Sequence, residues 1–147
     1  MSYLKTLMLF CLLFATGRAA AQKADAILGV WKAEEKVLTI RIYRQDSEYR
    51  GKVVTYKDRH HPEKDPEARR DVHNPDPDLR QRKIIGMDVL TGLHYNEADD
   101  AWEGGTLYNP GKGNTYSANV SINSSGKLEV RAFKGVTLLG KTMVFRR

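Results

Sequence analysis

The sequence has too little cysteine and too few long apolar runs to be stabilised by disulfides or a transmembrane helix. Its single cysteine, Cys11, has no partner within the chain, so no intramolecular disulfide can form. Cys11 lies in the apolar run 7–15, which is shorter than the ~20 residues that a membrane-spanning helix needs. No later run approaches that length. The rest of the chain therefore depends on its own hydrophobic core.

The N-terminal residues have the pattern of a secretory signal peptide. Lys5 provides the positive start, residues 7–15 the apolar centre, and Ala19-Ala20-Ala21 the small-residue cleavage site. We predict a signal peptide at residues 1–21, a mature chain that begins at Gln22, and export to the periplasm or the cell exterior. No small residue precedes Cys11, so a lipid anchor is not expected. An uncleaved membrane anchor is the alternative.

The charge balance is only mildly basic. The sequence has 24 Lys and Arg against 18 Asp and Glu, a formal net charge of +6, and loss of Lys5 and Arg18 with the signal lowers it to +4. Aromatic residues are not interleaved with the basic ones, so nucleic-acid binding is not predicted. A solvated basic face explains most of the excess, and a weak attraction to anionic membrane or wall polymers is the alternative. The main basic cluster is Arg69, Arg70, Arg80, Arg82 and Lys83.

Residues 22–147 read as one all-β domain. Short segments alternate apolar and polar residues, turn residues separate them, and no segment has the period of a long amphipathic helix. We predict an eight-stranded antiparallel up-and-down barrel, because closure removes the exposed strand edges of a sheet without disulfides. The predicted strands are 27–32, 37–44, 48–56, 84–90 with a continuation over 93–95, 101–108, 115–122, 127–133 and 136–145.

A long polar loop at residues 57–78 interrupts this pattern and leads into a stiff turn. Asp76 is an expected N-cap and Pro77 an expected first helical residue, which predicts a short helical turn near residues 76–82. Pro75 and Pro77 fix the backbone there. We call residues 71–82 the corner.

The corner holds the first candidate site. Paired arginines beside a rigid turn can hold a carboxylate or phosphate bidentately. The structural alternative is that Asp76 caps the turn while Arg80 or Arg82 pairs with Asp71 or Asp76 and locks the loop onto the barrel. The candidate ligand-binding residues are Asp71, Asn74, Asp76, Arg80 and Arg82.

A second candidate group lies on the strand at 101–108, which we also expect to contribute Trp102, Glu103 and Tyr108 to ligand binding. Strict alternation places Trp102 and Tyr108 on one face of that strand, and Glu103 and Leu107 on the other. A Glu103 that faced the interior would be a buried carboxylate and a candidate acid or base. The alternative is a solvent-facing Glu103 paired with a neighbouring basic residue.

No residue pattern predicts catalysis or a cofactor. His60 and His61, with Glu63, Asp65 and Asp71, are the one group that suggests a metal, but adjacent histidines in an extended segment point apart and His-x-His spacing is absent. Nucleophile, phosphate-binding and dinucleotide motifs are absent too. We therefore predict a non-enzyme without a metal or cofactor.

Two patterns resemble known proteins. Gly29-x-Trp31, together with Arg146 near the end of the last strand, is similar to the ends of lipocalin-type barrels, where an arginine packs over a tryptophan that plugs the barrel. The second pattern resembles the secreted bacterial family of unknown function DUF2147 over essentially the whole mature chain. It consists of Leu28-Gly29-Val30-Trp31, Tyr49-Arg50-Gly51-Lys52-Val53-Val54, Asp71-x-x-Asn74-Pro75-Asp76-Pro77-x-Leu79-Arg80-x-Arg82-x-Ile84-Ile85-Gly86, Trp102-Glu103-Gly104-Gly105-x-Leu107-Tyr108-Asn109-Pro110, Gly113-x-Thr115-Tyr116 and Leu138-Leu139-Gly140-Lys141-Thr142.

This resemblance implies an exported barrel of lipocalin-like (calycin-like) shape, with no established activity. Residues 59–70 depart from the family's shorter loop, which puts any function of that loop in doubt. We expect a small, partly apolar or anionic-headed ligand in a cup shaped by Tyr43, Tyr56, Trp102 and Tyr116, with Arg80 or Arg82 at its mouth. The alternatives are a filled barrel that docks an envelope protein or wall polymer, and an enzyme that uses Glu103 or Asp71.

Overall fold

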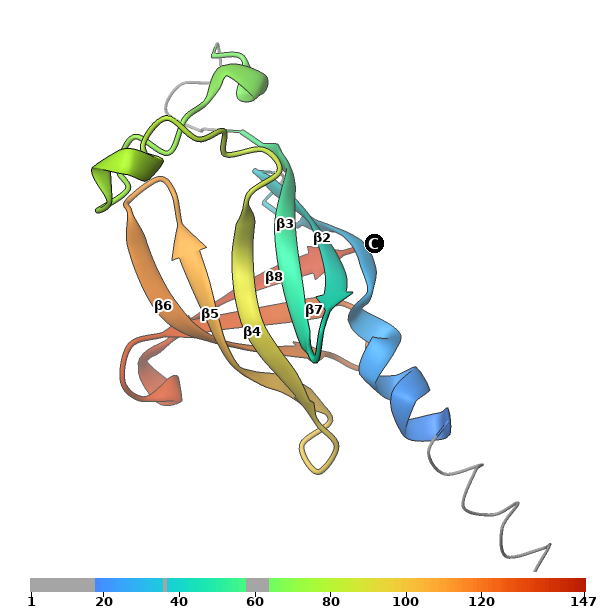
Figure 1. Cartoon of the computed structure of the whole chain (residues 1–147). Helices are drawn as coiled ribbons and strands as arrows, with labels where there is room; N and C mark the ends of the chain where they lie inside the picture. The colour runs from blue at the N-terminus through green and yellow to red at the C-terminus, as the bar shows by residue number, and fades with distance from the viewer. Residues whose placement is uncertain (1–17, 36, 58–63) are drawn as a thin grey trace, which may run out of the picture.

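Eight strands close into one antiparallel barrel in the computed structural model, which describes residues 18–35, 37–57 and 64–147 (Figure 1). Each strand pairs with the next in the chain, and β8 returns to β1. The predicted all-β up-and-down barrel is therefore confirmed. The strands are β1 (Gly29–Ala33), β2 (Leu38–Gln45), β3 (Glu48–Tyr56), β4 (Asp88–Asn96), β5 (Ala101–Asn109), β6 (Asn114–Ile122), β7 (Leu128–Phe133) and β8 (Lys141–Arg146).

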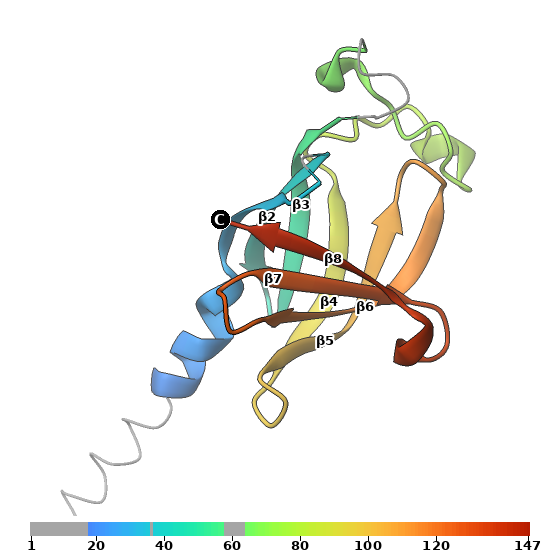
Figure 2. The same ribbon diagram turned by 180° about the vertical axis from the view of Figure 1, so that it is seen from behind.

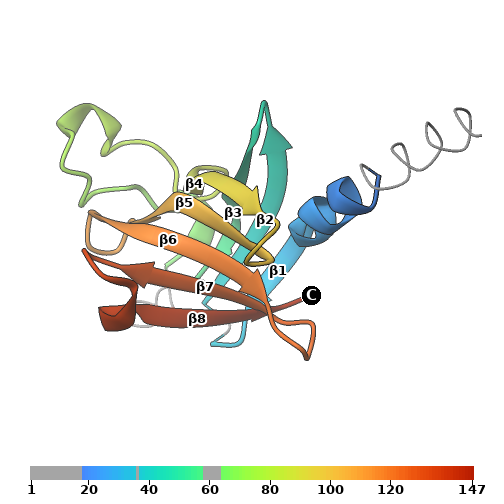
Figure 3. The same ribbon diagram turned by 90° about the horizontal axis from the view of Figure 1, so that it is seen from below.

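The helical pieces of the described chain are short. Residues 18–24 form a helix that leads into η1 (Asp25–Ile27), and Figure 3 shows it extending away from the barrel. The loop between β3 and β4 contains η2 (Pro66–Ala68) and η3 (Pro77–Leu79), and η4 (Thr137–Leu139) lies between β7 and β8. Asp76 caps η3 as predicted, since its carboxylate accepts from the Asp78 amide at 3.0 Å.

Alternating strands supply the core. Ala118 and Val120 of β6 are fully buried and pair with Ala132 and Val130 of β7, while Asn119 between them points outward. Complete burial of a valine-sized side chain stabilises a fold by ~1.5–3 kcal/mol. The alternation read from residues 115–133 thus determines which face of this sheet lines the barrel.

One end of the barrel, which we call the closed end, is plugged by two buried tryptophans. Trp31 Nε1 donates to the Ile27 carbonyl at 2.8 Å. Trp102 Nε1 donates to the Ala24 carbonyl at 2.9 Å. Both indole donors are satisfied, so these large rings are buried without an unpaired polar group.

The cation over the Trp31 ring is Arg147, and the prediction of Arg146 was wrong by one position. The Arg147 guanidinium carbon lies 4.3 Å from the ring centroid. Phe145 is buried in the barrel, so the alternation of β8 turns Arg146 outward, where it pairs with exposed Lys32. Arg147, the next residue, is therefore the one that reaches the Trp31 ring at the closed end.

Arg147 also ties the two ends of the barrel sheet together. Its guanidinium donates to the Ala26 carbonyl at 2.7 Å and to the Leu28 carbonyl at 3.1 Å. A Cβ atom at Gly29 would lie 2.9 Å from Arg147 Nη1, and Gly29 has a φ of +118° that other residues rarely adopt. The glycine before Trp31 therefore makes room for this cation.

A bulge in β5 changes which side chains face the interior. Strict alternation predicts opposite faces for Trp102 and Leu107, but both are buried inside the barrel. The register of β5 with β6 shifts after Trp102, and Gly104 has a φ of +72°. The extra residue restores Leu107 to the inner face and leaves Glu103 outside. The predicted grouping of β5 side chains was therefore wrong.

Two predicted strands begin later than expected. Residues 84–87 form a turn in which the Met87 amide donates to the Ile84 carbonyl at 3.2 Å, and Gly86 has a φ of +89°. Ile84 and Met87 are nevertheless buried, which explains their strand-like apolar pattern. Residues 137–139 form η4 in place of the start of the last strand.

The seam between β1 and β8 is short. Its strand pairs are Lys32 with Arg146 and Ala33 with Phe145, and the Glu34 amide adds a bond to the Val144 carbonyl at 2.9 Å. The first residues of β8, 141–143, pair with β7 and have no β1 partner in the described chain. The barrel wall is therefore interrupted on this side, towards the end opposite the tryptophans.

Candidate functional site: a cup and a corner at the open end

The end opposite the tryptophans, which we call the open end, contains a cavity of about 300 Å³. We call this cavity the cup. Its walls are mostly apolar, and Tyr56 reaches across the rim, where its hydroxyl would lie 3.2 Å from a Cβ atom placed on Gly111. The apolar residues of the wall include Leu38, Val53, Val89, Leu107, Met143 and Val144.

The cup lies behind the interrupted part of the seam. Ala33 and Glu34 line it from the β1 side, and Thr142 and Val144 line it from the β8 side. Since β1 ends at Ala33 while β8 begins at Lys141, the β8 residues Thr142 and Met143 border the cup without a β1 partner. The cup is therefore bordered on one side by a part of the barrel wall where β1 and β8 are not paired, in addition to its mouth at the open end.

A second hollow of about 530 Å³ adjoins the cup and shares Leu107, Asn109 and Met143 with it. Its border includes Lys112, Lys134 and Lys141, which we call the lysine rim. The three ammonium groups come from the β5–β6 turn, the end of β7 and the start of β8.

The lysine rim is basic, and no carboxylate among the described residues pairs with it. Lys134 Nζ lies 5.2 Å from the centroid of the Tyr116 ring, a cation–π contact. Among the ion pairs formed within the described ranges, none involves Lys112, Lys134 or Lys141. An apolar cup beside three such ammonium groups can hold a ligand with a hydrocarbon part and an anionic group.

The corner lies beside the open end and is organised around Asp71, which is 0% exposed. Its carboxylate accepts from Asn74 Nδ2 at 2.7 Å, from Arg82 Nε at 2.9 Å and from the Tyr108 hydroxyl at 2.6 Å. Arg82 Nη2 also lies 2.9 Å from it. A buried carboxylate with an arginine and two neutral donors is well compensated. Arg82 and Asp71 are thus paired in the way that the structural alternative describes, and their predicted role in ligand binding stays a prediction.

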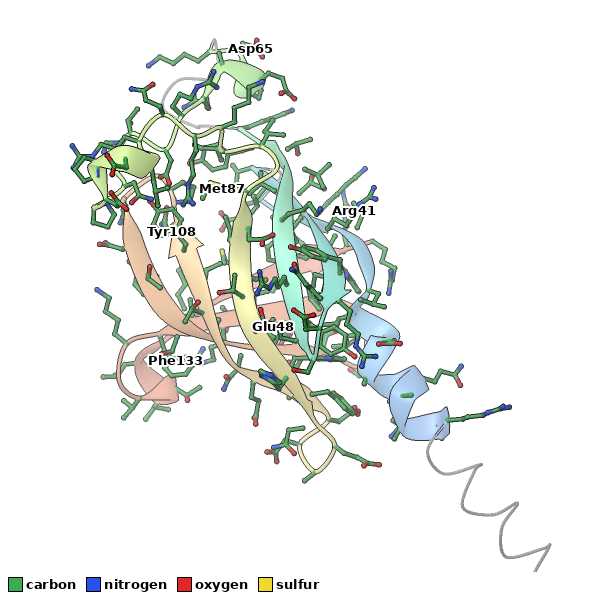
Figure 4. All side chains as sticks on the ribbon, viewed as in Figure 1. Arg41, Glu48, Asp65, Met87, Tyr108 and Phe133 are labelled. Atoms are coloured by element: carbon green, nitrogen blue, oxygen red, sulfur yellow. The ribbon has the colours of Figure 1, made fainter. Side chains whose placement is uncertain are left out.

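The backbone of the corner packs directly on the β5–β6 turn. A Cβ atom at Gly113 would lie 1.9 Å from the His73 carbonyl oxygen, and Gly113 has a φ of +67°. Figure 4 shows Tyr108 beneath this loop, near the end of β5, and Tyr108 also borders the cup. The guanidinium carbon of Arg82 lies 5.6 Å from the Tyr108 ring centroid. The corner is thus held by close backbone contact and by the Asp71 cluster.

The remaining candidate residues of the corner form hydrogen bonds with the backbone of the turn. Arg80 Nε donates to the Asn74 carbonyl at 2.8 Å. The Asn74 side-chain oxygen accepts from the Asp76 amide at 2.9 Å, and Asp76 accepts from the Asp78 amide. Neither arginine of the corner is among the residues that border the two hollows. Their predicted role in ligand binding stays a prediction.

The structure separates the β5 candidates. Tyr108 joins Asp71, whereas Trp102 lies at the closed end, and Glu103 on the outer face accepts from Asn96 Nδ2 at 3.0 Å. Of the aromatics expected around the cup, Tyr56 and Tyr116 border the hollows. Tyr43 does not, because it points outward and its hydroxyl donates to Asp88 at 2.8 Å.

Tyr108 in the corner cluster and Tyr49 at the closed end both have a raised pKa, because each is buried and donates to a carboxylate. Burial, with the hydrogen bond to Asp71, raises the pKa of Tyr108 to about 12. Burial and the hydrogen bond to Asp25 raise the pKa of Tyr49 at the closed end to about 12 as well. Both hydroxyls therefore act as fixed donors at neutral pH.

The histidine-rich segment falls largely outside the described ranges, which exclude His60, His61 and Glu63. Within those ranges, no three metal-ligating side chains gather at one point. The described helices also include none with the length and apolarity required to cross a bilayer.

Sequence reasoning missed the lysine rim. Its members are separated by 22 and 7 positions, and no local motif joins them. Strand register brings them together, because the end of β5 pairs with the start of β6 and Ala132 of β7 pairs with Lys141. The sequence signal that could have identified them is that each lysine lies in a turn or at a strand boundary at the same end of the barrel.

A closed eight-stranded meander with one tryptophan-plugged end and a hollow opposite end defines a lipocalin-like barrel. Among solved structures, one from Helicobacter pylori matches with a TM-score of 0.69 and 25% sequence identity, over 82% of this chain and 82% of that one. Its description reads "Protein HP1028 from the human pathogen Helicobacter pylori belongs to the lipocalin family". No curated protein matches the chain.

The chain belongs to the bacterial family described as "Uncharacterized protein conserved in bacteria (DUF2147)", whose pattern matches residues 29–147. The matched region starts at the first residue of β1 and includes all eight strands of the barrel.

Proposed function

We propose that this protein is an exported, non-catalytic carrier that holds a small, partly apolar ligand with an anionic group. The observation that carries this proposal is the hollow open end. An apolar cup of about 300 Å³ adjoins a hollow of about 530 Å³ that is bordered by the lysine rim. These volumes are in the range of small-molecule sites, in which apolar walls surround a few polar groups.

The position of the predicted cleavage site supports export of an intact barrel. The predicted signal peptide ends at Ala21, so the predicted mature chain keeps the residues that plug the closed end. Among these, Ala24 accepts from Trp102 and Ile27 accepts from Trp31. The predicted cleavage therefore leaves the plug complete, and the absence of disulfide bonds makes that plug important for stability.

The arrangement of charges supports binding over catalysis. Asp71 is fully engaged by three donors, and Glu103 lies on the outer face, away from the cup. A hydrocarbon chain would lie against the apolar wall of the cup, and its carboxylate or phosphate would face the lysine rim.

The decisive experiment asks whether the cup is filled by a ligand or merely hollow. Native mass spectrometry of the gently purified protein should reveal bound small molecules, and a fluorescent fatty acid should bind and be displaced by unlabelled fatty acid. Met143→Trp fills the wall common to both hollows and should abolish this binding. Thr106→Trp adds the same bulk on the exposed face of β5 and should leave binding unchanged.

The position of the anionic group is tested separately. Lys112→Gln, Lys134→Gln and Lys141→Gln, combined in one variant, should weaken fatty-acid binding at least about tenfold, since each partly exposed charge contact contributes up to ~1 kcal/mol. Arg80→Ala is the matched variant in the corner. If Arg80→Ala weakens binding without lowering the melting temperature and the lysine variant does not, the anionic group belongs at the corner.

A clean mass without ligand, together with no binding by the fluorescent fatty acid, would contradict the carrier proposal and favour a barrel that acts through its outer surface. Equal binding by wild type and Met143→Trp would place the ligand outside the cup.

A further inference from the structure

The β7–β8 loop, residues 134–141, concentrates exposed apolar side chains. Val136, Leu138 and Leu139 are 57%, 86% and 80% exposed. In the described chain the other exposed large apolar residues are Val72 and Leu79, in the corner and less exposed on average at 57% and 39%. Exposed apolar side chains gathered on one turn mark a surface that binds another apolar body.

The loop is held in a shape that displays these side chains. Arg131 Nε donates to the Thr137 carbonyl at 2.8 Å, and Arg131 Nη2 donates to the Leu138 carbonyl at 3.1 Å. A Cβ atom at Gly140 would lie 2.7 Å from the Ala132 carbonyl oxygen, so the end of the loop packs tightly on β7. Figure 2 shows η4 standing out from the barrel beside β7 and β8. The leucines are therefore fixed outward.

Positive charge flanks the apolar turn. Lys134 and Lys141 are exposed at its two ends, and Arg131 lies beneath it. Residues 130–147 contain no aspartate or glutamate. A surface with an apolar tip and a basic border of one sign is complementary to a bilayer that exposes anionic head groups.

We propose that the β7–β8 loop docks this protein on the surface of an anionic lipid bilayer. Val136, Leu138 and Leu139 enter the boundary between head groups and acyl chains, and Lys134 and Lys141 contact lipid phosphates. The interaction is peripheral and reversible, because three apolar side chains and two charges provide far less binding than a spanning helix.

Docking in this way places the open end at the lipid surface. Leu139 and Lys134 border the second hollow as well as belonging to the loop. The helix at residues 18–24 lies on the other side of the barrel from η4, as Figures 1, 2 and 3 agree. A bilayer bound by the loop therefore meets the border of the hollow and does not meet the closed end. The docking itself does not depend on a ligand in the cup.

The test is sedimentation of the purified protein with vesicles of phosphatidylglycerol and with vesicles of phosphatidylcholine. We expect binding to the anionic vesicles that salt weakens, and at least about tenfold weaker binding to the neutral ones, since each basic residue contributes roughly fivefold, or ~1 kcal/mol. Val136→Ser with Leu138→Ser should reduce binding to anionic vesicles at least about tenfold, because both substitutions remove apolar area that the bilayer boundary would bury.

The corner provides a matched control. Val72→Ser with Leu79→Ser removes the same two residue types from another exposed loop and should leave vesicle binding unchanged. All four side chains are exposed, so both double variants should keep the wild-type melting temperature. Leu138→Trp adds a direct readout: its emission should shift to shorter wavelength on anionic vesicles, against the background of two buried native tryptophans.

Two outcomes would overturn the inference: wild-type protein that stays in solution with anionic vesicles, or equal loss of binding in both double variants. The first outcome would instead favour a protein as the occupant of the loop. Fatty-acid binding tests the cup and vesicle sedimentation tests the loop, so failure of the carrier proposal and failure of membrane docking give different results.

Discussion

The two ends of the barrel are built on opposite principles. At the closed end, two buried tryptophans have satisfied donors, and Arg147 binds carbonyls and an indole ring at once. At the open end, apolar walls line a cavity and three lysines have no carboxylate partner in the described chain. The comparison indicates that the closed end is fully packed and hydrogen-bonded, whereas the open end keeps a cavity, which is where we propose that a ligand binds.

The open end is itself divided. Its corner is rigid, because a buried carboxylate and a close backbone contact fix it to the β5–β6 turn. The β7–β8 loop lies on the same end but presents apolar and basic side chains to solvent. The open end therefore combines a rigid corner with an exposed loop, and substitutions in the two should have different effects.

The largest expected difference comes from removing one leucine at each end. Leu93→Ala should lower the free energy of unfolding by about 4 kcal/mol, because Leu93, which pairs with Tyr49 at the closed end, is fully buried and packs against Gly105. Leu38→Ala at the cup should lower it by only about 1 kcal/mol, since Leu38 already borders a cavity. Urea unfolding followed by circular dichroism measures both, and equal losses would contradict the division between the ends.

A second prediction concerns the rigid part of the open end. Asp71→Asn should lower the free energy of unfolding by about 2–3 kcal/mol, because it removes the partner of Arg82 and disturbs two further hydrogen bonds in a buried cluster. Asp78→Asn, an exposed change in the same loop, should alter it by less than about 0.5 kcal/mol. Thermal unfolding of both variants gives the comparison. Similar values for the two would show that the cluster contributes little.

The third prediction separates the two terminal arginines. Arg147→Ala should lower the free energy of unfolding by about 1.5 kcal/mol, since it loses a cation–π contact and two carbonyl bonds at a partly exposed site. Arg146→Ala, on the outer face, should change it by less than about 0.5 kcal/mol. The reverse order in chemical unfolding would mean that the closed end is organised around the other arginine.

The smallest effect should appear at alkaline pH and should affect both ends alike. The folded state raises the pKa of Tyr49 and Tyr108 from 10.0 to about 12, so it holds these protons more tightly than the unfolded chain. Their contribution is complete below pH 10 and is lost as the pH rises towards 12. Tyr49→Phe and Tyr108→Phe should each flatten this decline and cost about 1 kcal/mol at neutral pH. Unfolding free energies measured between pH 8 and pH 11 provide the check.

Local sequence patterns were sufficient for most of the fold. Alternation over residues 115–133 predicted two inner faces that the barrel uses, and Asp76 followed by Pro77 predicted the cap of η3. These features depend on a strand period or on neighbouring backbone amides, so a short stretch contains the whole signal. The pairing of Arg82 with Asp71 could also be predicted from the sequence, as the alternative in which the corner holds the loop on the barrel.

Features that depend on distant residues were harder to predict. The bulge at Gly104 changes which β5 side chains face the barrel interior. It is defined by the pairing of β5 with β6, and the sequence of β5 alone does not show that one strand has an extra residue. The apolar run 136–139 resembles a strand, yet Arg131 binds two of its carbonyls and holds η4. The lysine rim and the cup likewise arise from register and closure, which join segments far apart in the chain.

The short seam has a consequence for local opening. Apart from the Arg147 bonds at the closed end, two strand pairs and one further amide bond join β1 and β8 in the described chain, so the two strands can separate towards the open end while the other strand ladders stay intact. Their parting would widen the cup sideways and would expose unpaired main-chain groups at a fresh edge. Hydrogen exchange should therefore be faster at the Glu34 amide, which donates across this seam, than at the amides of the longer strand ladders, and an apolar molecule would have a route through the wall as well as through the mouth.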